Sequence, residues 1–327
     1  MTLNGAIETA KTLHYESIVI DTHCDTLTAM TGEGRSLAGP SAKGQLDLFR
    51  LERGGVNIQF FSAFIGPEFK LSATHRALEL IDLFYREIEE NNHVALHAKS
   101  SLDIEKALSL GKIAAFLSIE GGEALEGSLG ILRLMYQLGV RSITLTWNGR
   151  NELGDGVDEE VTGGGLTRFG KDTVVEMNRL GMLVDVSHLS EKGFWDVLNI
   201  SRQPVIASHT NCRALCDHPR NLNDLQIKAL ANQGGVMGIT FVPDFLGENP
   251  AVAHVLSQIE HVIAVGGPDC VGIGSDFDGT DNLPAGLEDC SRLPVITRGL
   301  LERGYPENII KKVLGGNFIR VIEQVIK

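Results

Sequence analysis

The stretch SIVIDTHCDT, residues 17–26, passes directly from a β-branched apolar run into a group of polar residues. A short apolar run of this kind is typical of a buried strand. In an extended segment residues i and i+2 point to the same side, so His23 and Asp25 are expected to face together while Cys24 points away. Either these residues cap a strand at the surface, or the strand delivers an imidazole and a carboxylate to a site.

Seven further apolar runs resemble the first, and segments with helical periodicity lie between most of them. Several of these helices are predicted to end at a glycine, as at Gly139 and Gly181. Strands that alternate with helices favour parallel pairing through right-handed crossovers. The seven runs are 56–65, 112–120, 140–147, 183–188, 204–209, 234–241 and 270–277.

Eight strand–helix units in roughly 250 residues or more predict an α/β fold, a (β/α)8 TIM barrel in one domain, 1–327. The competing fold is an open, doubly wound sheet. That fold predicts a glycine-rich phosphate loop after the first strand, and DTHCDT (21–26) is not such a loop. The barrel is therefore the preferred prediction.

Composition excludes several classes of partner. The chain has 327 residues, a formal net charge of -13 and 43% hydrophobic residues, with no block of Lys and Arg. Nucleic acid and membrane partners are therefore not expected. The sequence shows no signal peptide, no apolar stretch of bilayer length and no CxxC pair among its five cysteines, which predicts a cytoplasmic protein with reduced thiols.

Chemically capable residues stand at the ends of six of the eight predicted strands. All strands of a (β/α)8 barrel open with their carboxyl ends on one face, where active sites lie. Residues far apart in the sequence are therefore expected to converge. They are His23, Asp25, Glu120, Trp147, Asn148, His188, His209 and Asp276.

Five of these residues are candidate metal ligands. His23 and Asp25 can bind one divalent ion, His188 and His209 can bind a second, and Glu120 can bridge the two. Histidine and carboxylate ligands without cysteine suit a catalytic Zn²⁺ and also admit Mn²⁺, Co²⁺ or Fe²⁺. Two such ions can hold a bridging hydroxide as nucleophile. The alternative is that each residue is an ordinary strand-end or turn residue.

At these residues the sequence resembles the membrane dipeptidase (renal dipeptidase) family of zinc peptidases. The motifs occur in the family's order over nearly the whole chain. They are DTHCDT (21–26), SIEGGEAL (118–125), VDVSHLS (184–190), ASHTNCRAL (207–215), HPRNL (218–222) and VGIGSDFDGT (271–280).

The resemblance implies a barrel of the metal-dependent hydrolase (amidohydrolase-like) type that hydrolyses dipeptides at a two-zinc centre, often with a D-residue at the C-terminal position. Matched residue by residue, His23 and Asp25 would bind the first zinc, and His188 and His209 the second. Glu120 would bridge them.

Two further residues match the family's substrate and proton chemistry. Arg220 corresponds to the arginine that receives the terminal carboxylate of the dipeptide, and Asp276 to the aspartate that handles protons. The animal members are secreted and lipid-anchored, whereas this chain resembles a cytoplasmic bacterial-type relative. Its oligomeric state is open, with a homodimer as one option.

One position departs from the family pattern. After the fourth predicted strand the animal enzymes carry a histidine that contacts the substrate, and this chain has Trp147 followed by Asn148. The indole N–H is a donor only. Either Trp147 or Asn148 donates a hydrogen bond to the substrate there, or the metals act alone.

Two alternative functions remain at this stage. One is a related binuclear-metal amidohydrolase acting on a lactam, a lactone or another amide. Such enzymes commonly begin with HxH and use a carboxylated lysine on strand four, whereas this chain has HxD and Glu120 on strand three. The other is a non-catalytic relative that binds metal or peptide, which only the Trp147 departure favours.

Overall fold

The apolar runs of the sequence form strands that are buried on both faces, as a parallel sheet covered by helices requires. The computed structural model of the chain describes residues 3–326. Its strands are β1 (Ile20–Asp21), β2 (Ile58–Phe64), β3 (Ala95–His97), β4 (Ile113–Glu120), β5 (Val140–Thr144), β6 (Leu183–Asp185), β7 (Ile206–Thr210), β8 (Val236–Ile239) and β9 (Val271–Ile273).

Eight of these strands close into a parallel barrel, which confirms the predicted (β/α)8 fold. The order around the ring is β2, β1, β9, β8, β7, β6, β5 and β4, and β4 returns to β2. That closing pair is in register from Ile58 with Ala114 to Phe64 with Glu120. Each barrel strand lies within one of the eight predicted runs, except that β7 extends one residue beyond its run to Thr210.

Strand β3 was not predicted and lies outside the barrel. It pairs with β4 only from Ala95 with Ile113 to His97 with Ala115. Strand β5 pairs with β4 from Leu117 onward, so β3 occupies the part of this edge that β5 leaves free. Its three residues are too few to show a period of two.

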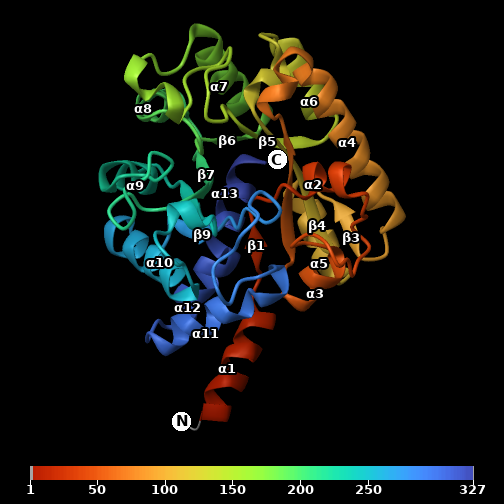
Figure 1. The fold of residues 1–327 in the computed structure, drawn as a ribbon, viewed down its shortest axis with the longest axis vertical. Coiled ribbons are helices and arrows are strands. Elements are labelled where there is room, and N and C mark those ends of the chain that lie inside the picture. The colour runs from red at the N-terminus through yellow and green to blue at the C-terminus, as the bar shows by residue number, and fades with distance from the viewer. Residues whose placement is uncertain (1–2, 327) are drawn as a thin grey trace.

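Helices surround the ring of strands (Figure 1). Helix α7 ends at Gly181, whose φ of 78° closes the last turn in the left-handed region, as predicted. The helices are α1 (Leu3–Tyr15), α2 (Thr26–Glu33), α3 (Leu48–Arg53), α4 (Ala73–Glu90), α5 (Ser101–Ser109), α6 (Leu129–Gln137), α7 (Arg168–Leu180), α8 (Glu191–Ile200), α9 (Asp224–Asn232), α10 (Val252–Gly266), α11 (Pro294–Glu302), α12 (Glu307–Lys311) and α13 (Asn317–Val325). Shorter helical turns are η1 (Pro67–Ser72), η2 (Gly122–Leu125), η3 (Val157–Thr162), η4 (Pro243–Phe245), η5 (Cys290–Arg292) and the π-turn η6 (Lys312–Gly316).

Helix α13 packs against residues of the barrel strands. Its Phe318, Val321 and Ile322 form an apolar cluster with strand residues that include Ile20 and Ile58. In Figure 1 α13 and the C-terminus lie near the centre of the ring of strands, whereas α1 projects away from it. This apolar cluster adds to the larger core between the strands and the outer helices.

Three further expectations concern the chain as a whole. Within residues 3–326, no helix combines the length and apolar character needed to cross a membrane. None of the five cysteines forms a disulfide. The single domain 1–327 stays a prediction, and residues 1, 2 and 327 lie outside the described part of the chain.

Candidate metal centre

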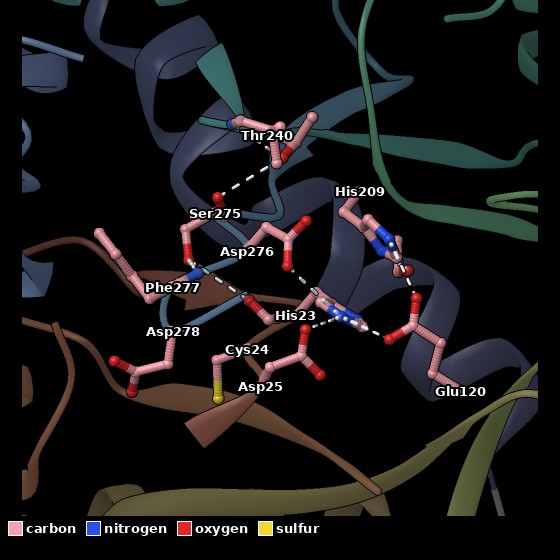
Figure 2. Close-up of polar contacts among 12 residues, drawn as sticks. His23, Cys24, Asp25, Glu120, His209, Thr240, Ser275, Asp276, Phe277 and Asp278 are labelled. Atoms are coloured by element: carbon pink, nitrogen blue, oxygen red, sulfur yellow. Dashed lines mark hydrogen bonds and ion pairs between the residues drawn. The ribbon is translucent and has the colours of Figure 1, made fainter. Parts of the chain in front are cut away.

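The five predicted ligand residues come together at the carboxyl ends of β1, β4, β6 and β7. His23, Glu120 and His209 are each only 1% exposed. His188 is 7% exposed, and Asp25 is partly buried. Figure 2 shows Asp25, Glu120 and Asp276 around His23, with His209 next to Glu120, while the Cys24 sulfur points away. Cys24 Sγ donates instead to the Phe60 carbonyl at 3.3 Å.

Glu120 lies between two groups of imidazole nitrogens. Its Oε1 is 2.9 Å from Nε2 of His188 and 3.5 Å from Nε2 of His209. Its Oε2 is 3.2 Å from Nε2 of His23. Burial opposes ionisation of this carboxyl, but the charge of His23, followed by the close contacts with the rings of His188 and His209, holds its pKa well below the usual range. One charged carboxylate therefore presents one oxygen to each group.

The ring of His23 is surrounded by carboxylates. Its Nε2 lies 3.8 Å from Asp25 Oδ2 and 3.8 Å from Asp276 Oδ1, in addition to Glu120. Burial lowers the pKa of His23, but the charges of Glu120 and Asp25 outweigh burial and hold it well above the usual value. This pocket therefore favours a positive charge at Nε2, which a divalent cation supplies more strongly than a proton.

The ring of His188 presents a bare nitrogen atom to the same centre. His188 Nδ1 lies 2.6 Å from the acceptor Oδ1 of Asn148, so the ring proton belongs on Nδ1. Its Nε2 then faces Nε2 of His209 at 2.8 Å. Burial, followed by the charge of Arg220, lowers the pKa of His188 to about 4, so its ring is neutral at pH 7. Neutral imidazoles are the form that binds metal.

The set of donors fits divalent cations. His23 Nε2, Asp25 Oδ1 and Glu120 Oε2 are buried polar atoms without a hydrogen-bond partner. Unpartnered buried polar atoms are rare and costly. Two groups of residues bring their ligand atoms within 4.8 Å of one another, namely His23, Glu120 and His209, and His23, Asp25 and Asp276. Nitrogen and oxygen ligands without thiolate suit Zn²⁺ in an open catalytic site.

Backbone conformation aims two of these side chains. His188 and Asp276 have positive φ angles, 65° and 68°. A non-glycine residue in this region costs about 1–3 kcal/mol and persists where surrounding structure holds it. His188 follows the end of β6 and Asp276 follows the end of β9. At both places the backbone turns sharply, and the turn directs the side chain into the site.

Asp278 has a different environment from Asp276, although both belong to the same short loop. In Figure 2 its carboxylate points away from His23 and Asp276. It accepts hydrogen bonds from Arg35 Nη2 at 2.6 Å, Thr26 Oγ1 at 2.7 Å and the Gln45 backbone at 2.6 Å. This buried ion pair ties the loop to the segment after α2.

Gly279 allows the carboxylates to approach each other. A Cβ at this position would collide with oxygens of both Asp25 and Asp276. The glycine in the motif SDFDG therefore has a local physical reason, because any side chain there would displace one of the two acids.

Arg220 is a buried cation beside the centre, with 3% of its surface exposed. Its Nη2 donates to the His209 carbonyl at 3.0 Å, and its guanidinium carbon lies 5.3 Å from the centre of the Phe245 ring. Its buried Nε has no partner. Burial lowers the pKa of Arg220 to about 10, against the opposing charges of Glu120 and Asp276. A free, desolvated donor on a cation is a receptor for an anion.

The two residues at the departure from the family pattern lie beside His188. The Trp147 ring centre is 6.0 Å from that of His188 and 5.5 Å from that of Phe64. Asn148 bonds to the His188 ring, a role that the sequence did not suggest. The predicted contacts of Trp147 and Asn148 with substrate stay predictions.

Sequence reasoning missed two carboxylates beneath the ligands. Asp21 and Asp185 are 0% and 1% exposed and lie in strands β1 and β6. Asp21 accepts from Ser275 Oγ at 2.6 Å, and Asp185 accepts from Ser208 Oγ at 2.5 Å. A signal was present, because an aspartate inside an apolar strand must find buried donors.

Comparison with known proteins agrees with this geometry. Residues 7–327 match the sequence model of the family described as membrane dipeptidase (peptidase family M19). An amidohydrolase from Pseudomonas aeruginosa is 28% identical, with a TM-score of 0.85 over 97% of this chain and 99% of that one. A structure described as dipeptidase AC, a metallopeptidase of family M19, is 28% identical, with a TM-score of 0.88 over 95% of this chain and 99% of that one.

A third similar structure carries a ligand. It is a metallopeptidase from Rhodobacter sphaeroides bound to a phosphinate mimic of the dipeptide L-Ala-D-Ala, 27% identical, with a TM-score of 0.86 over 95% of this chain and 100% of that one. The family match covers the barrel and every residue of the centre described above. The chain therefore belongs to the membrane dipeptidase family, peptidase family M19, and is a metal-dependent dipeptidase.

Proposed function

We propose that this dipeptidase works with two zinc ions, one held by His23 and Asp25 and one by His188 and His209, with Glu120 shared between them. The observation that carries the proposal is the position of Glu120, whose two oxygens face different imidazole groups at 2.9–3.5 Å. The ligand types also admit Mn²⁺, Co²⁺ or Fe²⁺. The chemistry that two such ions supply when bound is Lewis acidity and a shared hydroxide nucleophile at neutral pH.

Arg220 is proposed to bind the terminal carboxylate of the dipeptide. Its partnerless Nε and its burial next to His209 support this role. If Arg220 binds a carboxylate one residue beyond the scissile bond, the substrate is restricted to dipeptides, because a longer peptide has its terminal carboxylate farther from that bond. The L-Ala-D-Ala mimic bound to the Rhodobacter relative supports tolerance of a D-residue at the C-terminal position.

Asp276 is proposed to move the proton. It lies 3.8 Å from the His23 ring and faces the centre, so it can accept a proton from the attacking water and return it to the leaving amine. Burial raises the pKa of Asp276 to about 7, and nearby cations act in the opposite direction and favour its charged form. Trp147 and Asn148 remain candidate donors to the substrate carbonyl. A homodimer and a cytoplasmic location stay predictions.

Hydrolysis of a stereochemically defined dipeptide panel by the zinc-loaded protein tests the proposal. We expect cleavage of L,L and L,D dipeptides, loss of cleavage in chelator, and no cleavage of C-terminally amidated dipeptides. Arg220→Ala is expected to lower kcat/KM by the equivalent of roughly 2–4 kcal/mol, as for a charge-assisted pair in a desolvated site. Equal rates on free and amidated dipeptides would remove Arg220 from the substrate site.

A further inference from the structure

The second missed carboxylate, Asp185, is connected to a proposed metal ligand through one hydroxyl group. Ser208 Oγ lies 2.5 Å from Asp185 Oδ2 and 2.8 Å from His209 Nδ1. All three residues are at most 3% exposed, and the bonds between them are direct. Asp185, Ser208 and His209 therefore form a continuous path from a buried acid to the ring.

The other contacts of Asp185 fix its role as an acceptor. Its Oδ1 accepts from the backbone N–H groups of Ser187 at 3.0 Å and Ser208 at 2.9 Å. Its Oδ2 accepts from Thr144 Oγ1 at 2.5 Å as well as from Ser208. An ionised carboxylate has about four acceptor positions, so these four donors occupy all of them.

This arrangement decides where the proton of the His209 ring lies. A serine hydroxyl has one proton, and that of Ser208 is directed to Asp185, so Ser208 Oγ offers only a lone pair to the ring. His209 Nδ1 must then carry the proton. Its Nε2 is left bare, and this is the atom that faces Glu120 Oε1 and His188.

Strands β1 and β9 of the same barrel hold a similar pair without a ring attached. Ser275 Oγ donates to Asp21 Oδ2 at 2.6 Å, also between neighbouring strands and also buried. The other bonds of the Ser275 hydroxyl go to backbone groups, the His23 carbonyl at 3.3 Å and the Phe277 N–H at 3.2 Å. Ser275 is therefore a matched control for the hydroxyl–carboxylate bond alone.

We propose that Asp185 and Ser208 are positioning residues that hold His209 as its Nδ1–H tautomer and thereby set the affinity of one of the two metal positions. This inference rests on the proposed two-metal function, because it concerns an ion bound at His209. Partners that orient a metal-binding histidine typically change metal affinity 10- to 100-fold when removed.

The test compares zinc affinity in Ser208→Ala, Ser275→Ala and the unaltered chain, using competition with a chelator and elemental analysis. Ser208→Ala is expected to lower the affinity for one of the two zinc ions about 10- to 100-fold and to leave the affinity for the other unchanged. Ser275→Ala is expected to keep both affinities within about threefold, since its hydroxyl contacts no ring. Nitrogen-15 NMR of the zinc-loaded protein should show a protonated Nδ1 at His209 in the unaltered chain.

A second variant covers the case in which Ser208→Ala does not fold. Asp185→Asn keeps the side-chain shape but presents an amide donor to Ser208, which turns the hydroxyl proton toward the ring and favours the wrong tautomer. Asp185→Asn is therefore expected to lose affinity for one zinc ion, as Ser208→Ala does. Two tightly bound ions in every variant, or equal losses of zinc affinity in Ser208→Ala and Ser275→Ala, would overturn the positioning role of Asp185 and Ser208 and leave the two-metal function standing. An unaltered chain that binds no zinc would overturn the two-metal function and, with it, the positioning role of Asp185 and Ser208.

Discussion

Glu120 joins the two halves of the centre through a single side chain. Its oxygens face three imidazole nitrogens, which come from the carboxyl ends of strands β1, β6 and β7. A neutral side chain of the same size would keep the packing and remove the negative charge. The charge of this residue can therefore be tested separately from its shape.

Glu120→Gln is expected to lose affinity for both ions, because a neutral amide is a poor bridge between two cations. Elemental analysis after loading with excess zinc and dialysis measures the loss. Two ions per chain in this variant would contradict the shared-carboxylate arrangement.

Asp276→Asn tests proton transfer rather than binding. The amide keeps the shape and cannot take up a proton, so metal content should be nearly unchanged while kcat falls about 10²- to 10⁴-fold. Steady-state kinetics with elemental analysis on the same sample separates the two effects.

Asp278→Asn is the control for Asp276→Asn. Asp278 pairs with Arg35 at 2.6 Å, and removing one partner of a buried pair costs up to about 3–5 kcal/mol, so this variant should lose stability rather than its chemical step. If Asp278→Asn abolishes turnover while Asp276→Asn stays near the unaltered rate, Asp276 is the wrong carboxylate.

A buried histidine links helix α1 to two neighbouring helices. His14 is 0% exposed, and its Nε2 donates to the Gly54 carbonyl at 2.8 Å. Its Nδ1 accepts from Thr297 Oγ1 at 2.7 Å, so the ring joins α1 to the end of α3 and to α11. Burial favours the neutral ring, in which Nε2 donates and Nδ1 accepts.

The His14 contact should make stability depend on pH. Burial lowers the pKa of His14 below its ordinary 6.5, so between the two values the unfolded chain binds more protons than the folded one. Its contribution to the free energy of unfolding is therefore complete above about pH 6.5 and is lost as the pH falls toward the folded pKa. Urea unfolding from pH 5 to pH 8 should show a shallower pH dependence in His14→Gln than in the unaltered chain. Equal slopes would exclude this titration.

The candidate metal centre depends on the closed barrel, because the proposed ligands come from the carboxyl ends of four of its eight strands. Ions bound only by the folded state add RT ln(1 + [L]/Kd) to its stability, about 4 kcal/mol per site at a 1,000-fold excess over Kd. Chelation is therefore expected to lower the unfolding temperature by roughly 5–10 °C for a chain of this size. Scanning calorimetry with and without chelator measures the change. An unchanged unfolding temperature would show that the fold does not depend on the ions.

The sequence predicted the barrel because the barrel strands are apolar runs and segments with helical periodicity lie between most of them, and both signals are local. Strand β3 was missed because three residues show no period, and its pairing depends on where β5 begins. The convergence of His23, Glu120, His188 and His209 followed from the common direction of the strands.

Contacts that depend on distant donors could not be predicted in the same way. The bonds of Asp185 to Ser208 and of Asp278 to Arg35 join segments 23 and 243 positions apart. The bond from Asn148 to the His188 ring depends on how the loop after β5 folds back. No local pattern specifies these partners, although a buried aspartate in a strand signals that partners exist.

Strand β1 lies between β2 and β9, and this position has a consequence for the chain while it is being synthesised. The bond from Thr22 Oγ1 to the Ile273 carbonyl spans 251 positions, so one edge of β1 has no partner until β9 has been made. At about 5–20 residues per second this delay is roughly 10–50 s. Any sheet that formed during that time would be open, and its first strand would expose unpaired N–H and C=O groups, the kind of edge that pairs with other chains. His23 and Asp25, which follow that strand, emerge early, but Asp276 is made only after β9.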